Sequence, residues 1–150
     1  MPSKDTSLTM LGESQWEWVK KKINKPVNYR IIISSIQFLP IGHGWESWNN
    51  FPHERARLMN FIEMSALKNT LFLSGDRHRG GTYEIPIQGN RKIIEMTSSS
   101  LNLSYPNKEE LGPLRLGNTF VQENYGTILI DSKENLMFIN LKNIHGEIIQ

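Results

Sequence analysis

The sequence contains no cysteine, which excludes disulfide frameworks, thiolate zinc sites and cysteine nucleophiles but leaves the cellular compartment open. It also has no run of about eighteen apolar residues and no apolar stretch near its polar N-terminus, so it predicts neither a membrane span nor a signal peptide. An excess of one charge is missing as well, because 17 basic residues face 15 acidic ones. The resulting net charge of +2 argues against a nucleic-acid-binding surface.

The sequence does contain enough apolar material for a core. Its 150 residues are 38% hydrophobic, which suits one globular domain, or part of one, and is too little for two. Apolar spacing and turn residues predict the secondary structure. We expect a helix over 12–24, a strand over 29–37, a helix that Asn50 caps and that ends near 68–69, strands over 70–74 and 92–96, a long loop over 101–124, a hairpin of 126–130 with 136–141, and a short strand near 147–149.

These elements predict an α/β fold in which a mixed β-sheet has flanking helices. The run 29–37 is β-branched without alternation, as expected for a strand that is covered on both faces. The first three strands are followed by polar residues, at 34–37, 76–78 and 98–100. In open α/β sheets, ligands bind outside the carboxyl ends of the strands. We therefore expect the three polar segments to converge on one site.

Asp76 and His78 are the strongest candidates for chemistry. They follow an apolar strand and are separated by one residue, so an extended backbone would project both side chains to the same side. A carboxylate and an imidazole placed together make half of a metal site, and the alternative is a capped turn with a hydrogen-bonded histidine. Arg77 and Arg79 beside them either supply cations for a phosphate or lie exposed in the turn.

Other polar residues have structural explanations. His43 and His53 lie in or near a tryptophan-rich segment, and a structural or surface role is favoured for each. Glu54 suits the positive end of a helix, and Arg57 can pair with a carboxylate elsewhere. The serines at 98–100 have neither a Gly-x-Ser-x-Gly elbow nor an identifiable base. We expect their hydroxyls to bond a phosphate or the turn itself.

Five segments, taken in their order, resemble one family: 10–18 with its Leu-Gly-x-x-Gln-Trp pattern, 47–55, 73–78, 97–99 and 123–126. This order resembles the C-terminal half of the PhoD-like alkaline phosphatases, which are members of the calcineurin-like metallophosphoesterase superfamily. The resemblance implies that residues 1–150 form a partial domain, the C-terminal half of an αββα sandwich. It also implies hydrolysis of phosphate mono- and diesters by a metal-activated water, with calcium and iron as the metal ions.

For single residues, the resemblance implies that Asp76 and His78 are metal ligands and form the catalytic pair, and that Arg77, Ser98 and Ser99 contact the substrate. Two departures matter. The family's Trp-Asp-Gly-Tyr-Pro motif is replaced by Trp-Asn-Asn-Phe-Pro over 48–52, and its earlier aspartate-bearing ligand turns have no counterpart. A two-metal centre needs about five or six protein ligands. We therefore expect the isolated chain to be inactive, and whether it is an enzyme by itself stays open.

Two functional hypotheses follow. In the first, the chain is part of a phosphatase that is completed by a missing N-terminal half or by self-association, and Trp16, Trp18 and the apolar face of the first strand are then expected to be uncovered. In the second, it is a catalytically incomplete structural or interaction module, from a truncated or split gene. The resemblance implies a periplasmic or secreted location. It leaves open the ester, the metal ions and the oligomeric state.

Overall fold

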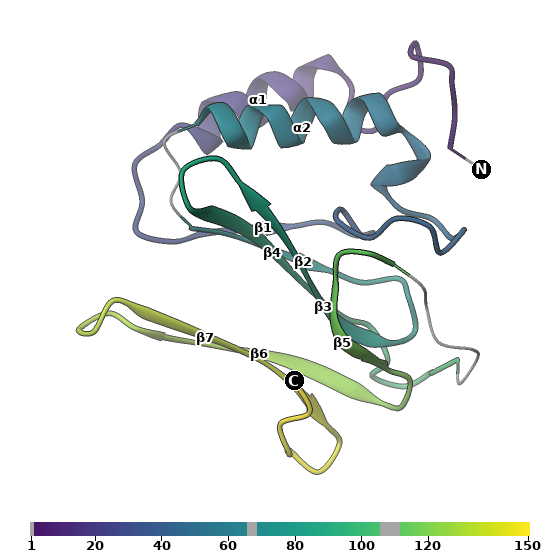
Figure 1. Ribbon diagram of the computed structural model, residues 1–150, viewed down its shortest axis with the longest axis vertical. Coiled ribbons are helices and arrows are strands. Elements are labelled where there is room, and N and C mark those ends of the chain that lie inside the picture. Colours follow the sequence, from purple (N-terminus) through teal and green to yellow (C-terminus); the bar gives the residue numbers. More distant parts are fainter. Residues whose placement is uncertain (1, 66–68, 106–111) are drawn as a thin grey trace.

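The computed structural model describes residues 2–65, 69–105 and 112–150. Its elements form three layers, with two helices on one side of a five-stranded sheet and a two-stranded hairpin on the other (Figure 1). In chain order they are α1 (Glu13–Ile23), β1 (Arg30–Ile33), the 3-10 helix η1 (Trp48–Asn50), α2 (Pro52–Met64), β2 (Asn69–Ser74), β3 (Gly80–Ile87), β4 (Arg91–Ser98), β5 (Arg115–Phe120), β6 (Asn124–Asp131) and β7 (Leu136–Asn143).

The large sheet has the strand order β1-β2-β4-β3-β5. Strands β1, β2 and β4 are parallel, whereas β3 runs antiparallel to both β4 and β5. Strands β6 and β7 form a separate antiparallel pair. The predicted mixed sheet with flanking helices is therefore confirmed, and so is the predicted hairpin.

The two helices arise from apolar spacing, and both pack on the same face of the sheet. In α1 the predicted stripe of Trp16, Val19 and Ile23 faces inward, with Trp16 only 1% exposed. In α2 the inward residues Leu58 and Ile62 lie one turn apart. The predicted cap at Asn50 is wrong, because that residue ends η1 and the helix begins after Phe51 with a proline in its first turn.

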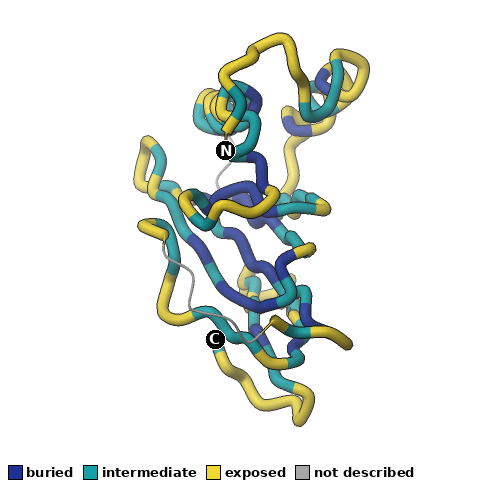
Figure 2. Tube along the Cα trace, turned by 90° about the vertical axis from the view of Figure 1, so that its right-hand side faces the viewer, coloured by how far each residue is buried: buried dark blue, intermediate teal, exposed yellow. Residues whose placement is uncertain are grey.

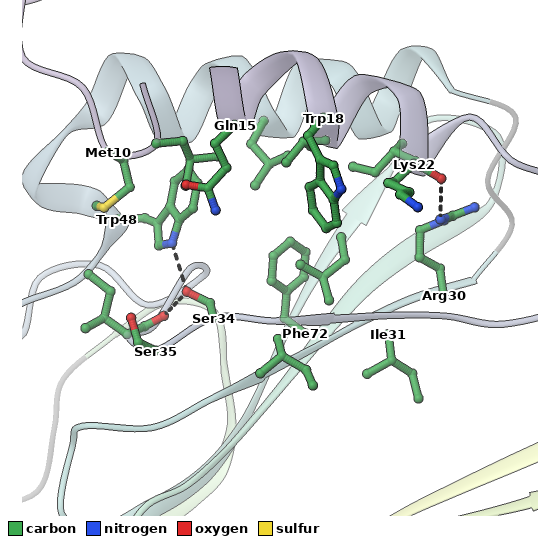
Figure 3. A pocket seen from close by; sticks show the side chains of 17 residues that line it. Met10, Gln15, Trp18, Lys22, Arg30, Ile31, Ser34, Ser35, Trp48 and Phe72 are labelled. Atoms are coloured by element: carbon green, nitrogen blue, oxygen red, sulfur yellow. Dashed lines mark hydrogen bonds between the residues drawn. The ribbon is translucent and has the colours of Figure 1, made fainter. Parts of the chain in front are cut away.

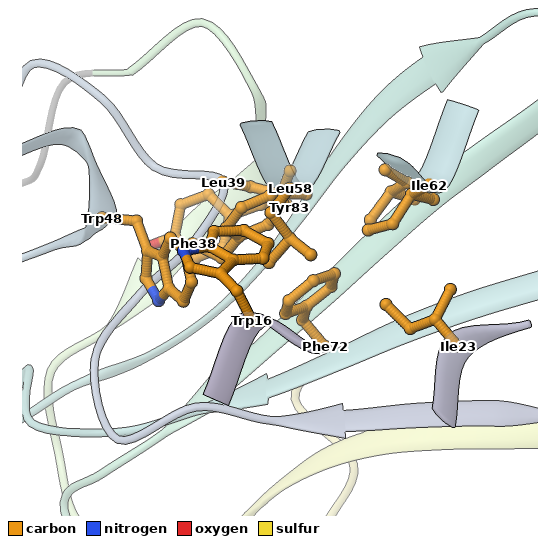
Figure 4. Packing of buried hydrophobic residues seen from close by; sticks show 10 residues of the cluster. Trp16, Ile23, Phe38, Leu39, Trp48, Leu58, Ile62, Phe72 and Tyr83 are labelled. Atoms are coloured by element: carbon orange, nitrogen blue, oxygen red, sulfur yellow. The ribbon is translucent and has the colours of Figure 1, made fainter. Parts of the chain in front are cut away.

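Aromatic side chains dominate the core between the helices and the sheet (Figure 4). Phe38 stacks on Phe72 at 4.3 Å between ring centroids, and the edge of Trp48 meets Phe38 at 5.5 Å. Trp16 makes a T-shaped contact with Trp48 at 6.5 Å. The expectation that Trp16 is uncovered is therefore wrong, since α2 and η1 enclose it. The buried residues are concentrated in the strands at the centre of the molecule (Figure 2).

Strand β1 is shorter and more open than the sequence predicted. It ends at Ile33, and its residues alternate between half-buried and exposed. Ile33 is 80% exposed and Ile31 is 37% exposed, so the expectation of a strand covered on both faces is wrong. The reason is position, because β1 is the first strand in the order and pairs with β2 alone among the described strands. The expected exposure of this strand and of Trp18 is confirmed.

Two strands were missed. Strand β3 contains Pro86, which sequence rules disfavour in a sheet, but in the described part of the chain the pairing of β5 with β3 runs from Gly80 to Tyr83 and ends in a bond from the N–H of Glu84 to Leu114. Pro86 therefore lies where β3 is an edge and its missing N–H costs no ladder bond. Strand β5 falls inside the segment predicted as a long loop, of which residues 106–111 lie outside the described part. The short strand predicted near 147–149 is reduced to one bridge between Lys142 and Ile148.

The hairpin lies close against the sheet at glycine positions. A Cβ atom on Gly80 would lie 2.6 Å from a methyl carbon of Leu141, and one on Gly126 would lie 2.6 Å from the methyl carbon of Met96. Side chains at these positions would push β6 and β7 away from the sheet. The close contact places the beginning of β6 beside the carboxyl end of β4, where polar residues gather.

Candidate functional site

The carboxyl ends of β1, β2 and β4 meet at one edge of the sheet, as the sequence predicted. The backbone N–H of Ser34 donates to the carbonyl of Leu73 at 2.9 Å, which ties the end of β1 to β2. Beyond β2, the N–H of Arg77 donates to the hydroxyl of Ser99 after β4 at 2.9 Å. Because the strands are adjacent and parallel, the polar segments that follow them lie side by side.

Asp76 and His78 lie in a bend, not in extended backbone. Both have left-handed dihedrals, with φ of 60° at Asp76 and 52° at His78. The sequence argument that period-two spacing aligns their side chains is therefore wrong, because that period holds only for a strand. Asp76 is exposed, His78 is half-buried, and Arg77 between them points inward and is 7% exposed. Two non-glycine residues in this region within one turn indicate backbone strain of the kind found at functional sites.

His78 is held in a definite orientation. Its Nδ1 donates to the carbonyl oxygen of Leu103 at 3.1 Å, and its ring lies 4.4 Å from the ring of Tyr105. The carbonyl can only accept, so the proton of a neutral ring lies on Nδ1 and the lone pair on Nε2. A backbone carbonyl on one nitrogen of the ring is the usual support of a histidine that binds metal through the other nitrogen.

The serine pair divides between two tasks. The hydroxyl of Ser99 accepts from the N–H of Arg77 and donates to the carbonyl of Arg79 at 3.2 Å, so it braces the bend from inside. The hydroxyl of Ser98 instead donates to the side-chain oxygen of Asn124 at 3.1 Å, on the side of the hairpin. The structure thus brings Ser99 together with Asp76 and His78, and it turns Ser98 towards β6.

Arg77 and Arg79 are buried, so the interpretation of both as exposed turn residues is wrong. The guanidinium of Arg77 lies 5.7 Å from the ring centre of Trp45. Arg79 is 4% exposed and donates to the hydroxyl of Thr119 at 3.2 Å. Burial lowers the pKa of Arg77, and the like charge of Arg79 lowers it further. Two cations near one another under an exposed carboxylate make this edge of the sheet electropositive beneath its surface.

His43 joins this group, although the sequence, which allowed it to face the same cleft, favoured a structural or surface role. The N–H of Trp45 donates to His43 Nδ1 at 3.0 Å, so the ring proton lies on Nε2. Burial lowers the pKa of His43 to about 4, helped by the charges of Arg77 and Arg79. Among the described residues His43 Nε2 is buried without a hydrogen-bond partner. The signal was a histidine between two glycines and before a tryptophan. His53, in contrast, has the structural role expected, with Nε2 bonded to the carbonyl of Leu8 at 2.7 Å.

The donor set fits part of a metal centre. Asp76 offers an exposed carboxylate and His78 an oriented Nε2, and hard and borderline divalent ions bind these groups. Within residues 2–65, 69–105 and 112–150, no cluster brings three His, Cys, Asp or Glu side chains together as a metal would require. Asp76 and His78 are therefore candidate ligands without a third such side chain grouped with them in the described part of the chain.

Comparison with known proteins gives this edge of the sheet a context. The family model described as PhoD-like phosphatase matches residues 1–149. The chain belongs to this family. It is also 25% identical over 108 residues to the alkaline phosphatase D of Bacillus subtilis strain 168, a match over 66% of this chain and 18% of that protein. A solved structure titled "Structure of PhoD" superposes with a TM-score of 0.63 and 16% identity, covering 99% of this chain and 37% of that one.

This PhoD-like chain thus spans about a fifth of the curated relative and little more than a third of the solved structure. The likeness to the solved structure confirms the predicted α/β fold with a mixed sheet. No helix among the described residues is long and apolar enough to cross a membrane.

Hydrogen bonds connect two of the five segments that resemble the family, 10–18 and 47–55. Glu54, from the segment 47–55, is 3% exposed and accepts from the indole N–H of Trp16 at 2.8 Å. The same carboxylate accepts from the hydroxyl of Thr9 at 2.7 Å and the N–H of Met10 at 3.0 Å. Arg57 lies 4.2 Å above the ring of Trp16 and pairs with Glu13, as the sequence suggested it could with some carboxylate. One buried carboxylate therefore joins the beginning of α1 to the beginning of α2.

Proposed function

We propose that this chain contributes Asp76 and His78 to the metal centre of a phosphatase that hydrolyses phosphate esters. The observation that carries the proposal is the orientation of His78, whose Nδ1 is bonded to a backbone carbonyl in a strained bend of a PhoD-like chain. A bound metal would polarise the phosphoryl oxygen and lower the pKa of an attacking water. Calcium suits the carboxylate of Asp76 and iron the imidazole of His78.

The chain's own residues would hold the ester. Arg77 directly follows Asp76 and supplies a guanidinium for phosphoryl oxygens. Ser99 would act through the bend, because its hydroxyl is already bonded to the backbone at Arg77 and Arg79. A role for Ser98 requires its hydroxyl to leave Asn124. A substrate contact by Arg77 likewise requires its guanidinium, which is 7% exposed and packed on Trp45, to turn outward, while Ser99 and Ser98 support the shape of the site.

The remaining ligands would come from polypeptide outside these 150 residues. A groove of about 590 Å³ runs along the open edge of β1 beneath α1 (Figure 3). Trp18, Val19 and Ile23 line it from the helix side, and residues of β1 line it from the sheet side. The five residues from Arg30 to Ser34 span about 17 Å at the rise per residue of a strand. We propose that an extended segment from the rest of a PhoD-like fold pairs with β1 in this groove.

A second candidate function is supported by the same groove. A chain with an open strand edge and exposed Ile33 and Trp18 can act by association alone, as a non-catalytic module. Light scattering of the purified chain separates the two. Association that weakens in an Ile33→Lys variant supports the groove as an interface, and a stable monomer contradicts self-association through it. A chain that associates but binds no metal favours the module.

The metal assignment is tested by NMR with Mn²⁺, whose unpaired electrons broaden nearby signals. The chain has 4 histidines, so their ring signals are resolvable. We expect Mn²⁺ to broaden His78 before His53 and His145, and an Asp76→Ala variant to need a higher concentration for the same broadening. Equal broadening of all histidines, or none at millimolar metal, would contradict the assignment.

The phosphatase assignment is tested by hydrolysis of p-nitrophenyl phosphate and bis-p-nitrophenyl phosphate. For this assay, the chain is fused to the part of a PhoD-like phosphatase that it does not cover. We expect metal-dependent hydrolysis that an Asp76→Ala, His78→Ala double variant abolishes, with Asp131→Ala, in the hairpin turn, as the matched control. Undiminished hydrolysis in the double variant would sink the site assignment.

A further inference from the structure

The backbone at 37–39, which follows β1, is gripped from two sides. On one side the N–H groups of Phe38 and Leu39 donate to the carboxylate of Glu95, at 3.0 and 2.5 Å. On the other side the guanidinium of Arg55 donates to the carbonyls of the same two residues, at 2.8 and 2.9 Å. Phe38, Leu39 and Glu95 are each 0% exposed. A carboxylate from β4 and a cation from α2 thus hold the backbone of the same two residues.

The carboxylate also reaches the strand that leads to the candidate site. Ser74, the last residue of β2, donates its hydroxyl to Glu95 at 2.5 Å and shares a hydrogen bond of 2.8 Å with Thr97. The side chain of Gln37 donates to the same Thr97 hydroxyl at 2.8 Å. Glu95 is therefore bonded both to 38–39 and to the residue before the Gly75–Arg79 bend.

The gripped backbone is the base of a loop that carries His43 and Trp45. The N–H of Trp48 donates to the carbonyl of Gln37 at 2.8 Å, which closes the loop at its two ends. From this base the loop extends until Trp45 meets the guanidinium of Arg77. It presents the Nε2–H of His43, which has no partner among the described residues, on the same side. A shift of the base would move this donor relative to the bend.

Burying the carboxylate of Glu95 costs free energy, because the charged form loses its hydration. Burial raises the pKa of Glu95, against the hydrogen bonds from Ser74, Leu39 and Phe38 and the charge of Arg55. Apolar packing of similar volume is often as stabilising as buried charges or more so. What the carboxylate adds is direction, since both of its oxygens accept bonds and fix two peptide planes at once.

We propose that Glu95 and Arg55 are positioning residues, which set the His43 loop against the Asp76–His78 bend by holding the peptide groups of Phe38 and Leu39. They touch neither metal nor substrate and act through the backbone. The inference rests on the proposed function only in treating that bend as part of the site.

The test compares Glu95→Gln with wild type by NMR of the intact chain. An amide keeps the size of the carboxylate but offers one acceptor oxygen, and its NH₂ must face a donor N–H or the hydroxyl of Ser74. We expect amide exchange at Phe38 and Leu39 to rise about tenfold, as the loss of a hydrogen bond predicts. We also expect the pKa of His43 to move from about 4 towards 6.5, because the ring leaves its buried place beside Arg77 and Arg79.

The matched control is Glu84→Gln on the neighbouring strand β3, which loses only the exposed pair with Lys92 at 2.7 Å. A general loss of stability would affect all histidines alike, whereas positioning predicts a change at His43 with His53 and His145 unmoved. If Glu95→Gln does not fold, Arg55→Lys decides, since it keeps the charge and loses the two-carbonyl grip. An unchanged His43 in the folded variant, or equal changes in Glu84→Gln, would overturn the proposal.

The result is separable from the proposed function. The Mn²⁺ effect on His78 tests the metal ligands, while the His43 titration is measured without metal. If Mn²⁺ does not broaden His78 but the pKa of His43 shifts in Glu95→Gln, the positioning role stands and the metal assignment falls. If Mn²⁺ broadens His78 but His43 is unchanged in Glu95→Gln, the metal assignment stands and the positioning role falls.

Discussion

The carboxylate that joins the two helices should account for a large share of the stability of the chain at neutral pH. In a Glu54→Gln variant, the bonds from Trp16, Thr9 and Met10 lose their charge-assisted character. Hydrogen bonds to charged groups contribute about 1.5–3 kcal/mol and neutral ones about 0.5–1.5. Three bonds that each lose about 1 kcal/mol lower the free energy of unfolding by about 3 kcal/mol. At 150 residues this is a fall in Tm of about 6–12 °C.

The pH dependence gives the prediction its sign. Burial raises the pKa of Glu54, but the hydrogen bonds from Trp16, Thr9 and Met10 outweigh it, so the pKa lies below the usual 4.5. The stability that the carboxylate contributes is therefore complete above pH 4.5 and is lost as the pH falls through the lowered value. The assay is urea unfolding of wild type and variant at pH 7 and pH 3. We expect the difference between them to shrink at the lower pH.

Glu13→Gln is the matched control, because Glu13 bonds the same Arg57 at 3.0 Å but its side chain is 77% exposed. An exposed ion pair contributes little to stability in water, so this variant should unfold nearly as wild type does. A Glu54→Gln loss below about 1 kcal/mol at pH 7, or a loss of the same size at both pH values, would refute the reasoning.

Three further predictions concern the edge of the sheet. Gly80→Ala places a methyl 2.6 Å from Leu141 and should cost about 1–3 kcal/mol in urea unfolding, whereas Gly75→Ala, with its nearest neighbours at 3.7 Å, should cost less. The pKa of His43 is lowered from 6.5 to about 4, so its contribution to stability is complete above pH 6.5 and falls towards pH 4. In a His43→Gln variant the urea unfolding midpoint should therefore depend less on pH between these values, and an unchanged dependence contradicts this. Ser99→Ala should raise amide exchange in the bend about tenfold, and unchanged exchange would rule out the brace.

The sequence predicted secondary structure correctly where a pattern of residues is typical of one kind of element. The stripe of Trp16, Val19 and Ile23 predicted α1, and the apolar run before Gly75 predicted β2. Strand β3 was missed because Pro86 is acceptable only where no neighbour needs its N–H, which depends on how far β5 extends. Spacing along the chain does not contain that information. The same holds for β1, whose composition suits a covered strand although the fold leaves it at an edge.

The candidate site divides in the same way. Asp76 and His78 were found from residue type and position, but their left-handed backbone was not, because no glycine or asparagine announced it at His78. Burial of Arg77 and Arg79 also depends on long-range contacts, with Ser99, Trp45 and Thr119. Glu95 did leave a signal, as a charged residue inside an apolar strand. Such a residue must be satisfied by distant groups, and these cannot be named from the sequence alone.

Glu54 and Glu95 order the frame that carries the Asp76–His78 bend. Each carboxylate is at most 3% exposed and accepts bonds from more than one distant segment: Glu54 joins α1 to α2, and Glu95 joins β2 to the loop after β1. Neither of them is a proposed metal ligand, and neither bond set passes through Asp76 or His78. The bend has hydrogen bonds of its own within the chain, from the N–H of Arg77 to Ser99 and from His78 to the carbonyl of Leu103. A metal ion and the remaining ligands would meet a bend that is already shaped, which reduces the cost of assembling the centre.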